Sequence, residues 1–133
     1  PRIRNSILQA PAGGAVLLRS TEAPLPGDLA ANCLWGFDDL VAGSLAIRGP
    51  AGLAALNALN VGDAALAAKP NIEEAPASTF GEPLKGIPRL RAGSACVDGA
   101  LPLEGFEADF RGGYRPGPAG PGAPDIGADE FRE

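Results

Sequence analysis

The sequence has no histidine and no methionine, and of its 133 residues only one is a tryptophan and one a tyrosine. The absence of histidine excludes catalytic triads and metal sites that depend on imidazole. The 11 Lys and Arg residues are scattered singly and the formal net charge is −5, so the sequence lacks the basic patch that nucleic-acid binding requires. No apolar run approaches the ~20 residues that span a bilayer. We therefore expect no nucleic-acid partner and no membrane span in this chain.

Glycine and proline are instead abundant, with 19 and 14 residues respectively. Their combined share is far above average usage, which disfavours long helices. The length suits one domain or part of one. We therefore expect a single domain or fragment over residues 1–133, with a small core and many turns.

Two short segments recur in the first half of the chain. Residues 5–8 (NSIL) resemble residues 32–35 (NCLW), and residues 14–20 (GAVLLRS) resemble residues 43–49 (GSLAIRG). A unit of about 28 residues with two strands therefore occurs twice. Stacking such units in parallel, about 4.8 Å apart, joins their apolar faces into one core. The alternative is two ordinary β-hairpins in a small sandwich.

Polar and aromatic side chains fall at matching places of this repeat. Asn5 and Asn32 either stack as an amide ladder or each begin a turn. Arg19 and Arg48 could lie one above the other and bind a uronate carboxylate, or serve as solvated charges that discourage strand addition. Trp35 either stacks on a sugar ring or covers the edge of the core.

The segment after the repeat has a different pattern. Residues 51–58 are rich in Ala and Leu, which predicts a short helix, and a second helical turn is expected over residues 64–68, before Lys69-Pro70. Proline punctuates residues 70–93, and residues 112–124 are a Gly/Pro-rich loop without the strict period of collagen.

Several motifs of the second half resemble one protein family. The resemblance rests on five segments: residues 32–35 (NCLW), residues 71–80 (NI followed by Pro76 and Phe80), residues 89–99 (RLRAGSACVDG), residues 109–115 (DFRG followed by Arg115) and residues 125–131 (DIGADEF). These resemble the late coil and C-terminal signatures of secreted pectin-lyase-like right-handed parallel β-helix proteins, of the choice-of-anchor Q type. Ala95 stands where the family usually has proline.

The resemblance implies an all-β fold: two to three C-terminal coils of a right-handed parallel β-helix, with a short helix and a loop-rich C-terminal cap. Residues 1–49 would form two coils, residues 50–69 a helical excursion, and residues 70–133 the last strand and the cap. The implied role is non-catalytic, because the catalytic groove of such proteins lies on middle coils. The chain would pack on upstream coils or a partner chain, at the cell surface or outside the cell. The alternatives are the tail of a polysaccharide lyase or hydrolase, and a carbohydrate-binding or adhesive module.

In a secreted protein, the two cysteines, Cys33 and Cys96, suggest a disulfide. It would close a loop of about 63 residues and contribute roughly 4 kcal/mol. Two buried free thiols are the alternative, and a functional thiol is a third.

Acidic residues concentrate in the last third of the chain. Asp98, Asp125 and Asp129 are candidate Ca²⁺ ligands, although no EF-hand spacing is present, and we expect no other cofactor. Asp98 and Asp125 are alternatively expected to cap turns, and Asp109 to pair with Arg111 or Arg115. The resemblance adds structural roles for two further residues of the terminal motif, Gly127 and Glu130.

Overall fold

The structure is a computed structural model, and it describes residues 2–10, 15–20, 25, 28–43, 47–48, 50–80, 89–117, 122–128 and 130–131. The elements along the described residues are β1 (Ile3–Arg4), β2 (Ile7–Gln9), β3 (Ala15–Ser20), β4 (Leu29–Ala30), β5 (Cys33–Trp35), β6 (Phe37–Gly43), β7 (Ile47–Arg48), α1 (Pro50–Ala58), α2 (Ala64–Ala67), β8 (Ile72–Glu73) and α3 (Pro76–Thr79). The longest of these helices, α1, has nine residues, and none of the described helices could cross a membrane.

The strands form three small sheets, with the orders β1-β4, β2-β5-β8 and β3-β6-β7. Every pair is parallel except β6 with β7, which is antiparallel. The three N-terminal strands, β1, β2 and β3, each lie at one end of their sheet, and no other described strand pairs with their outer side.

The strand pairing follows the sequence repeat only in part. Ile7 lies opposite Cys33 in parallel strands, a separation of 26 residues (33 − 7), one fewer than the predicted 27. The second match of the repeat meets only at its edge among the described residues, where Ser20 lies opposite Gly43. Strand β3 pairs along β6, and β7 turns back onto the other side of β6. Short-range similarity therefore located the first strand pair but not its register or the second pair.

The predicted all-β, right-handed parallel β-helix is wrong. The structure is a mixed α/β arrangement of small parallel sheets and short helices, without a solenoid in the described part of the chain. Two physical causes are visible. The Ala/Leu-rich residues after the repeat form helices where a further coil would need strands. The described residues of the Gly/Pro-rich stretch, 89–117, 122–128 and 130–131, form turns, and the one bridge found among them joins Ala108 to Tyr114.

Helices α1 and α2 lie within the stretch predicted to be helical. Pro50 occupies the first position of α1, where its missing N–H costs nothing. The side chain of Asp63 caps α2 by accepting hydrogen bonds from the backbone N–H groups of Ala65 and Leu66. Leu56 of α1 is fully buried, so this helix is fixed by its packing against the sheets.

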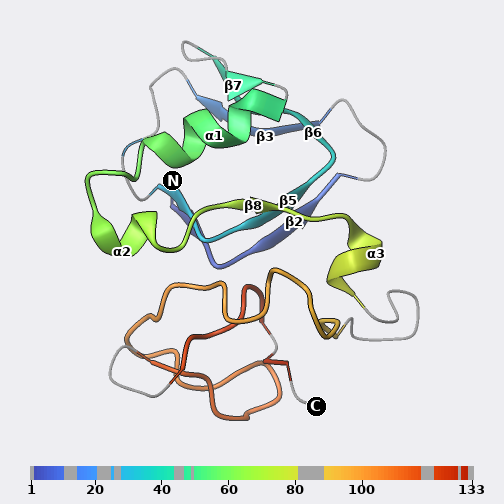
Figure 1. The fold of residues 1–133 in the computed structure, drawn as a ribbon, viewed down its shortest axis with the longest axis vertical. Coiled ribbons are helices and arrows are strands. Elements are labelled where there is room, and N and C mark those ends of the chain that lie inside the picture. Colours follow the sequence, from blue (N-terminus) through green and yellow to red (C-terminus); the bar gives the residue numbers. More distant parts are fainter. Residues whose placement is uncertain are drawn as a thin grey trace.

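Two apolar clusters lie on opposite faces of β5, because neighbouring residues of a strand point to opposite sides. Leu34 faces the first cluster, which contains Leu29, Leu40, Val41 and Leu56. Cys33 faces the second, which contains Leu90, Cys96, Ala100 and Ile126. Figure 1 shows the consequence: the C-terminal segment, drawn in orange and red, lies against the sheet of β2, β5 and β8 on the side away from α1.

A close backbone approach fixes β2 beside β5. Gly36 has φ +76°, and a Cβ at this position would lie 2.1 Å from the carbonyl oxygen of Ala10. Only glycine fits here, since the contact is with backbone that cannot move aside. Asn5 and Ala31, which lie before β2 and β5, also have positive φ values, 53° and 52°.

Candidate functional site at the seam of the sheet and the C-terminal segment

The two cysteines meet in the second apolar cluster, together with a carboxylate. The cluster consists of Cys33 of β5, Glu74 directly after β8 and Cys96 of the C-terminal segment. One sulfur or oxygen atom from each lies within 4.8 Å of the others. The Cys96 thiol donates to Glu74 Oε2 over 3.4 Å. Both cysteines are buried and not joined to each other. Three segments distant in sequence therefore meet at one cluster of ionisable groups.

Hydrogen bonds hold the Glu74 carboxylate in place. Ser94 Oγ donates to Oε2 over 2.6 Å, and the backbone N–H of Ala95 donates to Oε1 over 2.9 Å. Ser94 Oγ in turn accepts from the backbone N–H of Cys96 over 3.1 Å. The turn that carries Cys96 is thus fastened to Glu74 on both carboxylate oxygens.

The environment shifts the pKa values of these groups in different directions. Burial raises the pKa of Glu74, but the hydrogen bonds from Ser94, Ala95, Thr79 and Cys96 outweigh it, and the net pKa lies below its usual value. The neighbouring Cys96 thiol is the largest influence on Cys33 and lowers the pKa of that thiol, while burial opposes it. The proximity of Cys33, with burial, raises the pKa of Cys96.

No sequence pattern pointed to Glu74. Adjacent residues of a strand point to opposite faces, so the neighbours Glu73 and Glu74 do not by themselves indicate a paired-carboxylate site. In the structure Glu73 is exposed and Glu74 is half-buried beside the cysteines. Its position depends on where residues 94–96 fold back, which no local pattern reveals.

The predicted Asn5–Asn32 ladder is wrong, but an amide ladder exists elsewhere. Asn32 Nδ2 donates to Asn71 Oδ1 over 2.9 Å, and Asn71 Nδ2 donates to Asn57 Oδ1 over 2.9 Å. Asn5 instead exchanges two hydrogen bonds with the backbone of Leu101, over 2.7 and 2.8 Å. Asn5 thus ties the strands to the C-terminal segment, whereas Asn32 organises the sheet.

The acidic residues of the last third are engaged in turns. The buried Asp125 carboxylate accepts from the backbone N–H groups of Asp98 and Phe131, and Asp109 Oδ1 accepts from those of Arg111 and Gly113. The side chain of Asp98 is exposed. Asp129, the third candidate Ca²⁺ ligand, lies outside the described residues.

Arg115 holds together the residues of the last motif, residues 125–131. It donates to the carbonyl oxygens of Gly127 and Asp125 over 2.7 and 2.6 Å and forms an ion pair of 3.3 Å with Glu130, both side chains being about nine-tenths buried. Burial raises the pKa of Glu130, more than its hydrogen bond from the Asp125 N–H and the Arg115 charge lower it. The expected structural roles of these residues are consistent with this network.

The candidate sugar-binding residues are spread over different places. Arg19 of β3 lies opposite Ala42 and Arg48 of β7 lies opposite Asp39. Strand β6 therefore lies between the backbones of the two arginines, so the repeat does not place Arg19 and Arg48 in register on neighbouring strands. Trp35 is 36% exposed and borders a separate hollow of about 320 Å³.

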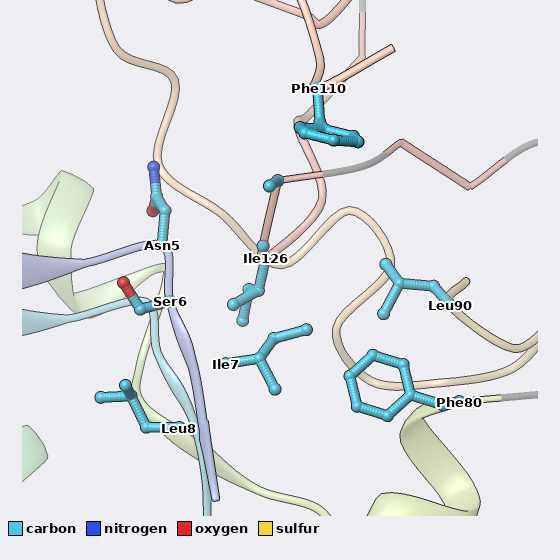
Figure 2. A pocket seen from close by; sticks show the side chains of 10 residues that line it. Asn5, Ser6, Ile7, Leu8, Phe80, Leu90, Phe110 and Ile126 are labelled. Carbon is cyan, nitrogen blue, oxygen red and sulfur yellow. The ribbon is translucent and has the colours of Figure 1, made fainter. Parts of the chain in front are cut away.

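An apolar hollow of about 570 Å³ lies beside β2, on the same face as Cys33. Figure 2 shows Ile7 directed toward Ile126, Leu90 and Phe80, whereas Ser6 and Leu8 lie on the other side of the strand. The full lining comprises Asn5, Ser6, Ile7, Leu8, Phe80, Leu90, Phe110, Ile126, Gly127 and Ala128.

The chain matches no protein-family model, no curated protein and no solved structure. Its function is therefore inferred from the geometry of the open strands, the hollow and the cysteine–glutamate cluster.

Proposed function

We propose that this chain is a non-catalytic structural module that binds an extended segment of another protein chain as an additional strand on the open side of β2. The observation that carries the proposal is a difference in solvent exposure between paired side chains of β2 and β5. Leu8 and Ile7 of β2 are half-buried, while their partners across the strand pair, Leu34 and Cys33, are 3% and 1% exposed. The partner strand β5 has a neighbour on both sides, and β2 has one.

The backbone of β2 has hydrogen-bonding groups on its open side. Ser6 O accepts from Cys33 N, and Ala10 N donates to Trp35 O. Alternate residues of a strand direct their backbone groups to opposite sides, so the even-numbered residues bond to β5 while Ile7 and Gln9 face outward. An added strand would pair with these groups, the common mode by which a sheet edge binds an extended peptide.

Side chains next to this edge offer both apolar contact and a polar group. An added strand would place alternate side chains in the hollow beside Ile7, where Phe110 is 65% exposed. In addition, the Gln9 Nε2 atom is buried without a hydrogen-bond partner among the described residues. A shift of this side chain on strand addition would let a carbonyl oxygen of the incoming segment accept from Nε2, which removes the free-energy penalty of a buried unpaired donor.

The experiment uses a synthetic peptide with the sequence of residues 28–36, carrying Cys33→Ser, because this segment already pairs with β2 on its other side. We expect saturable binding and slower hydrogen exchange of the Ile7 and Gln9 amides. Gln9→Pro removes an outward N–H without touching the bonds to β5 and should abolish binding. Gln9→Ala retains that N–H and should bind. Equal binding to both variants, with both folded by circular dichroism, would refute strand addition.

A second candidate function, carbohydrate binding, rests on Trp35. This exposed ring borders its hollow together with Phe37 and the carboxylates of Asp38 and Glu73, and aromatic faces beside hydrogen-bonding groups suit sugar rings. Quenching of the fluorescence of Trp35, which is the only tryptophan, by uronate or neutral oligosaccharides would favour this candidate. An unchanged spectrum across both classes of sugar would exclude it.

A further inference from the structure

The cluster of Cys33, Glu74 and Cys96 has no part in strand addition, yet hydrogen bonds hold its ionisable side chains together at the seam. Cys33 and Cys96 are 1% and 0% exposed. The three residues of the cluster come from different parts of the fold. Cys33 lies in the central strand β5, Glu74 directly follows β8, and Cys96 lies in the turn of residues 94–97. A group that bonded to all three would fasten the C-terminal segment to the sheet.

The separations suit a small thiophilic cation. Tetrahedral Zn²⁺, with bonds of about 2.3 Å to sulfur and 2.1 Å to oxygen, places neighbouring ligand atoms about 3.6–3.8 Å apart. The distance from Cys96 Sγ to Glu74 Oε2 is 3.4 Å, and all three ligand atoms lie within 4.8 Å of one another. Small side-chain adjustments would bring them to the required spacing.

The supporting hydrogen bonds are those expected around a metal ligand. Bound carboxylates are commonly oriented by outer hydrogen bonds, and Glu74 accepts from Ser94 Oγ and from the backbone N–H of Ala95. Thr79, fully buried, lies beside both Cys33 and Glu74. Its hydroxyl or a water molecule would complete four-fold coordination.

We propose that Cys33, Glu74 and Cys96 bind a thiophilic divalent cation of the Zn²⁺ class, which cross-links β5, β8 and the C-terminal segment. Binding converts two thiols to thiolates and releases two protons, so that two thiolates and one carboxylate surround the divalent ion. Ca²⁺ and Mg²⁺ are not suited to this site because they prefer oxygen ligands to sulfur. The site is distinct from the aspartates that the sequence indicated for Ca²⁺.

The test is titration of the reduced, metal-free chain with Co²⁺ and then Zn²⁺. We expect one ion per chain, an intense thiolate-to-cobalt charge-transfer band, displacement of Co²⁺ by Zn²⁺, and release of two protons per ion. Zn²⁺ should also protect both cysteines from alkylation. These readouts use the unaltered chain, so they do not depend on whether a variant folds.

Variants then assign the ligands. Ser94→Ala, which removes a supporting hydrogen bond, should weaken Zn²⁺ binding about 10- to 100-fold, and Cys33→Ser or Cys96→Ser by more. Glu74→Gln should weaken binding, whereas Glu73→Gln, at the exposed neighbouring position, should leave it unchanged and is the matched control.

Two results would overturn the proposal. One is Co²⁺ uptake without a charge-transfer band, or with a band that survives Cys33→Ser. The other is a reduced chain that takes up no Co²⁺ and, with oxidised glutathione as the oxidant, loses both free thiols to a Cys33–Cys96 disulfide. In that exchange the two cysteines are oxidised, and each molecule of glutathione disulfide is reduced to two thiols.

Discussion

The strand-bearing part of the chain, residues 2–80, and the C-terminal segment, residues 89–131, are held by different kinds of hydrogen bond. In the first part, backbone groups pair repeatedly between parallel strands, and apolar residues from α1 and three sheets fill one cluster. In the second, single side chains such as Asp125, Asp109 and Arg115 satisfy the backbone of turns. The comparison teaches that a Gly/Pro-rich segment can be ordered without strands when each turn has its own polar anchor.

The largest expected loss of stability comes from removing Arg115, which holds the turns of the C-terminal segment together. Arg115→Met removes three polar contacts and leaves the Glu130 carboxylate unpaired in a buried position. We expect a loss of about 3–5 kcal/mol in the free energy of unfolding, measured by urea denaturation. Arg89→Met, at an exposed cation of the same segment, is the control and should change stability by less than about 0.5 kcal/mol. Similar losses for both variants would contradict the anchoring role.

The next effect tests the apolar cluster of the strand-bearing part. Leu56→Ala truncates a fully buried side chain of α1, and such truncations cost about 3 kcal/mol through lost burial and a residual cavity. Leu25→Ala, at a residue that is 68% exposed, should be nearly neutral. Hydrogen exchange should show that Leu56→Ala loosens α1 and β6 before the C-terminal segment. Uniform loosening of both parts would show that they do not open separately.

The amide ladder allows a polar test within the strand-bearing part. Asn71→Ala leaves Asn32 and Asn57 each without one partner. Buried polar groups that lose a partner cost about 1–3 kcal/mol, so we expect a loss of about 2 kcal/mol in urea denaturation. A change below about 0.5 kcal/mol would mean that water replaces Asn71 in the ladder.

Gly127 tests the contact between the two parts. It has φ +112°, and a Cβ there would lie 3.1 Å from Ile7 Cδ1 of β2. Gly127→Ala should therefore destabilise the fold by about 1–2 kcal/mol, mostly through backbone strain. Gly62→Ala, where an added Cβ meets nothing within 4 Å, is the matched control. Thermal unfolding of the two variants should separate them, and equal melting temperatures would refute the strain.

The smallest effect is a pH dependence from Glu130. Its pKa in the folded chain is raised above the usual value of 4.5, so the folded state holds a proton that the unfolded state has released. The free energy of unfolding therefore falls as pH rises from the unfolded pKa through the folded pKa, and the full cost is present above that window. Glu130→Gln should gain stability relative to the unaltered chain as pH rises through this range. Urea denaturation at several pH values checks this, and a constant difference would contradict the raised pKa.

The site shows where local patterns stop being informative. The number of cysteines, in a secreted context, suggested a Cys33–Cys96 disulfide, with two buried free thiols as one alternative. The structure brings the two cysteines together as free, buried thiols. Glu74 was missed because its role depends on Ser94 and Ala95, twenty residues further along the chain. Of the two alternatives for Asn5 and Asn32, the shared amide ladder is wrong. A register of 26 residues places Asn5 opposite Ala31 and leaves Asn32 to bond with Asn71.

The sequence by itself determined three features: the helical stretch after the repeat, the parallel pairing of the first repeated segment (residues 5–8 with residues 32–35), and the turn-forming residues of the last third. These features depend on residues close together in the chain or on repeated apolar spacing. Only the tertiary structure decided the mixed α/β architecture, the antiparallel return of β7 onto β6, and the meeting of Cys33, Glu74 and Cys96. The physical reason is that propensity acts over a few residues, whereas register and side-chain clusters are set by packing between segments far apart in the chain.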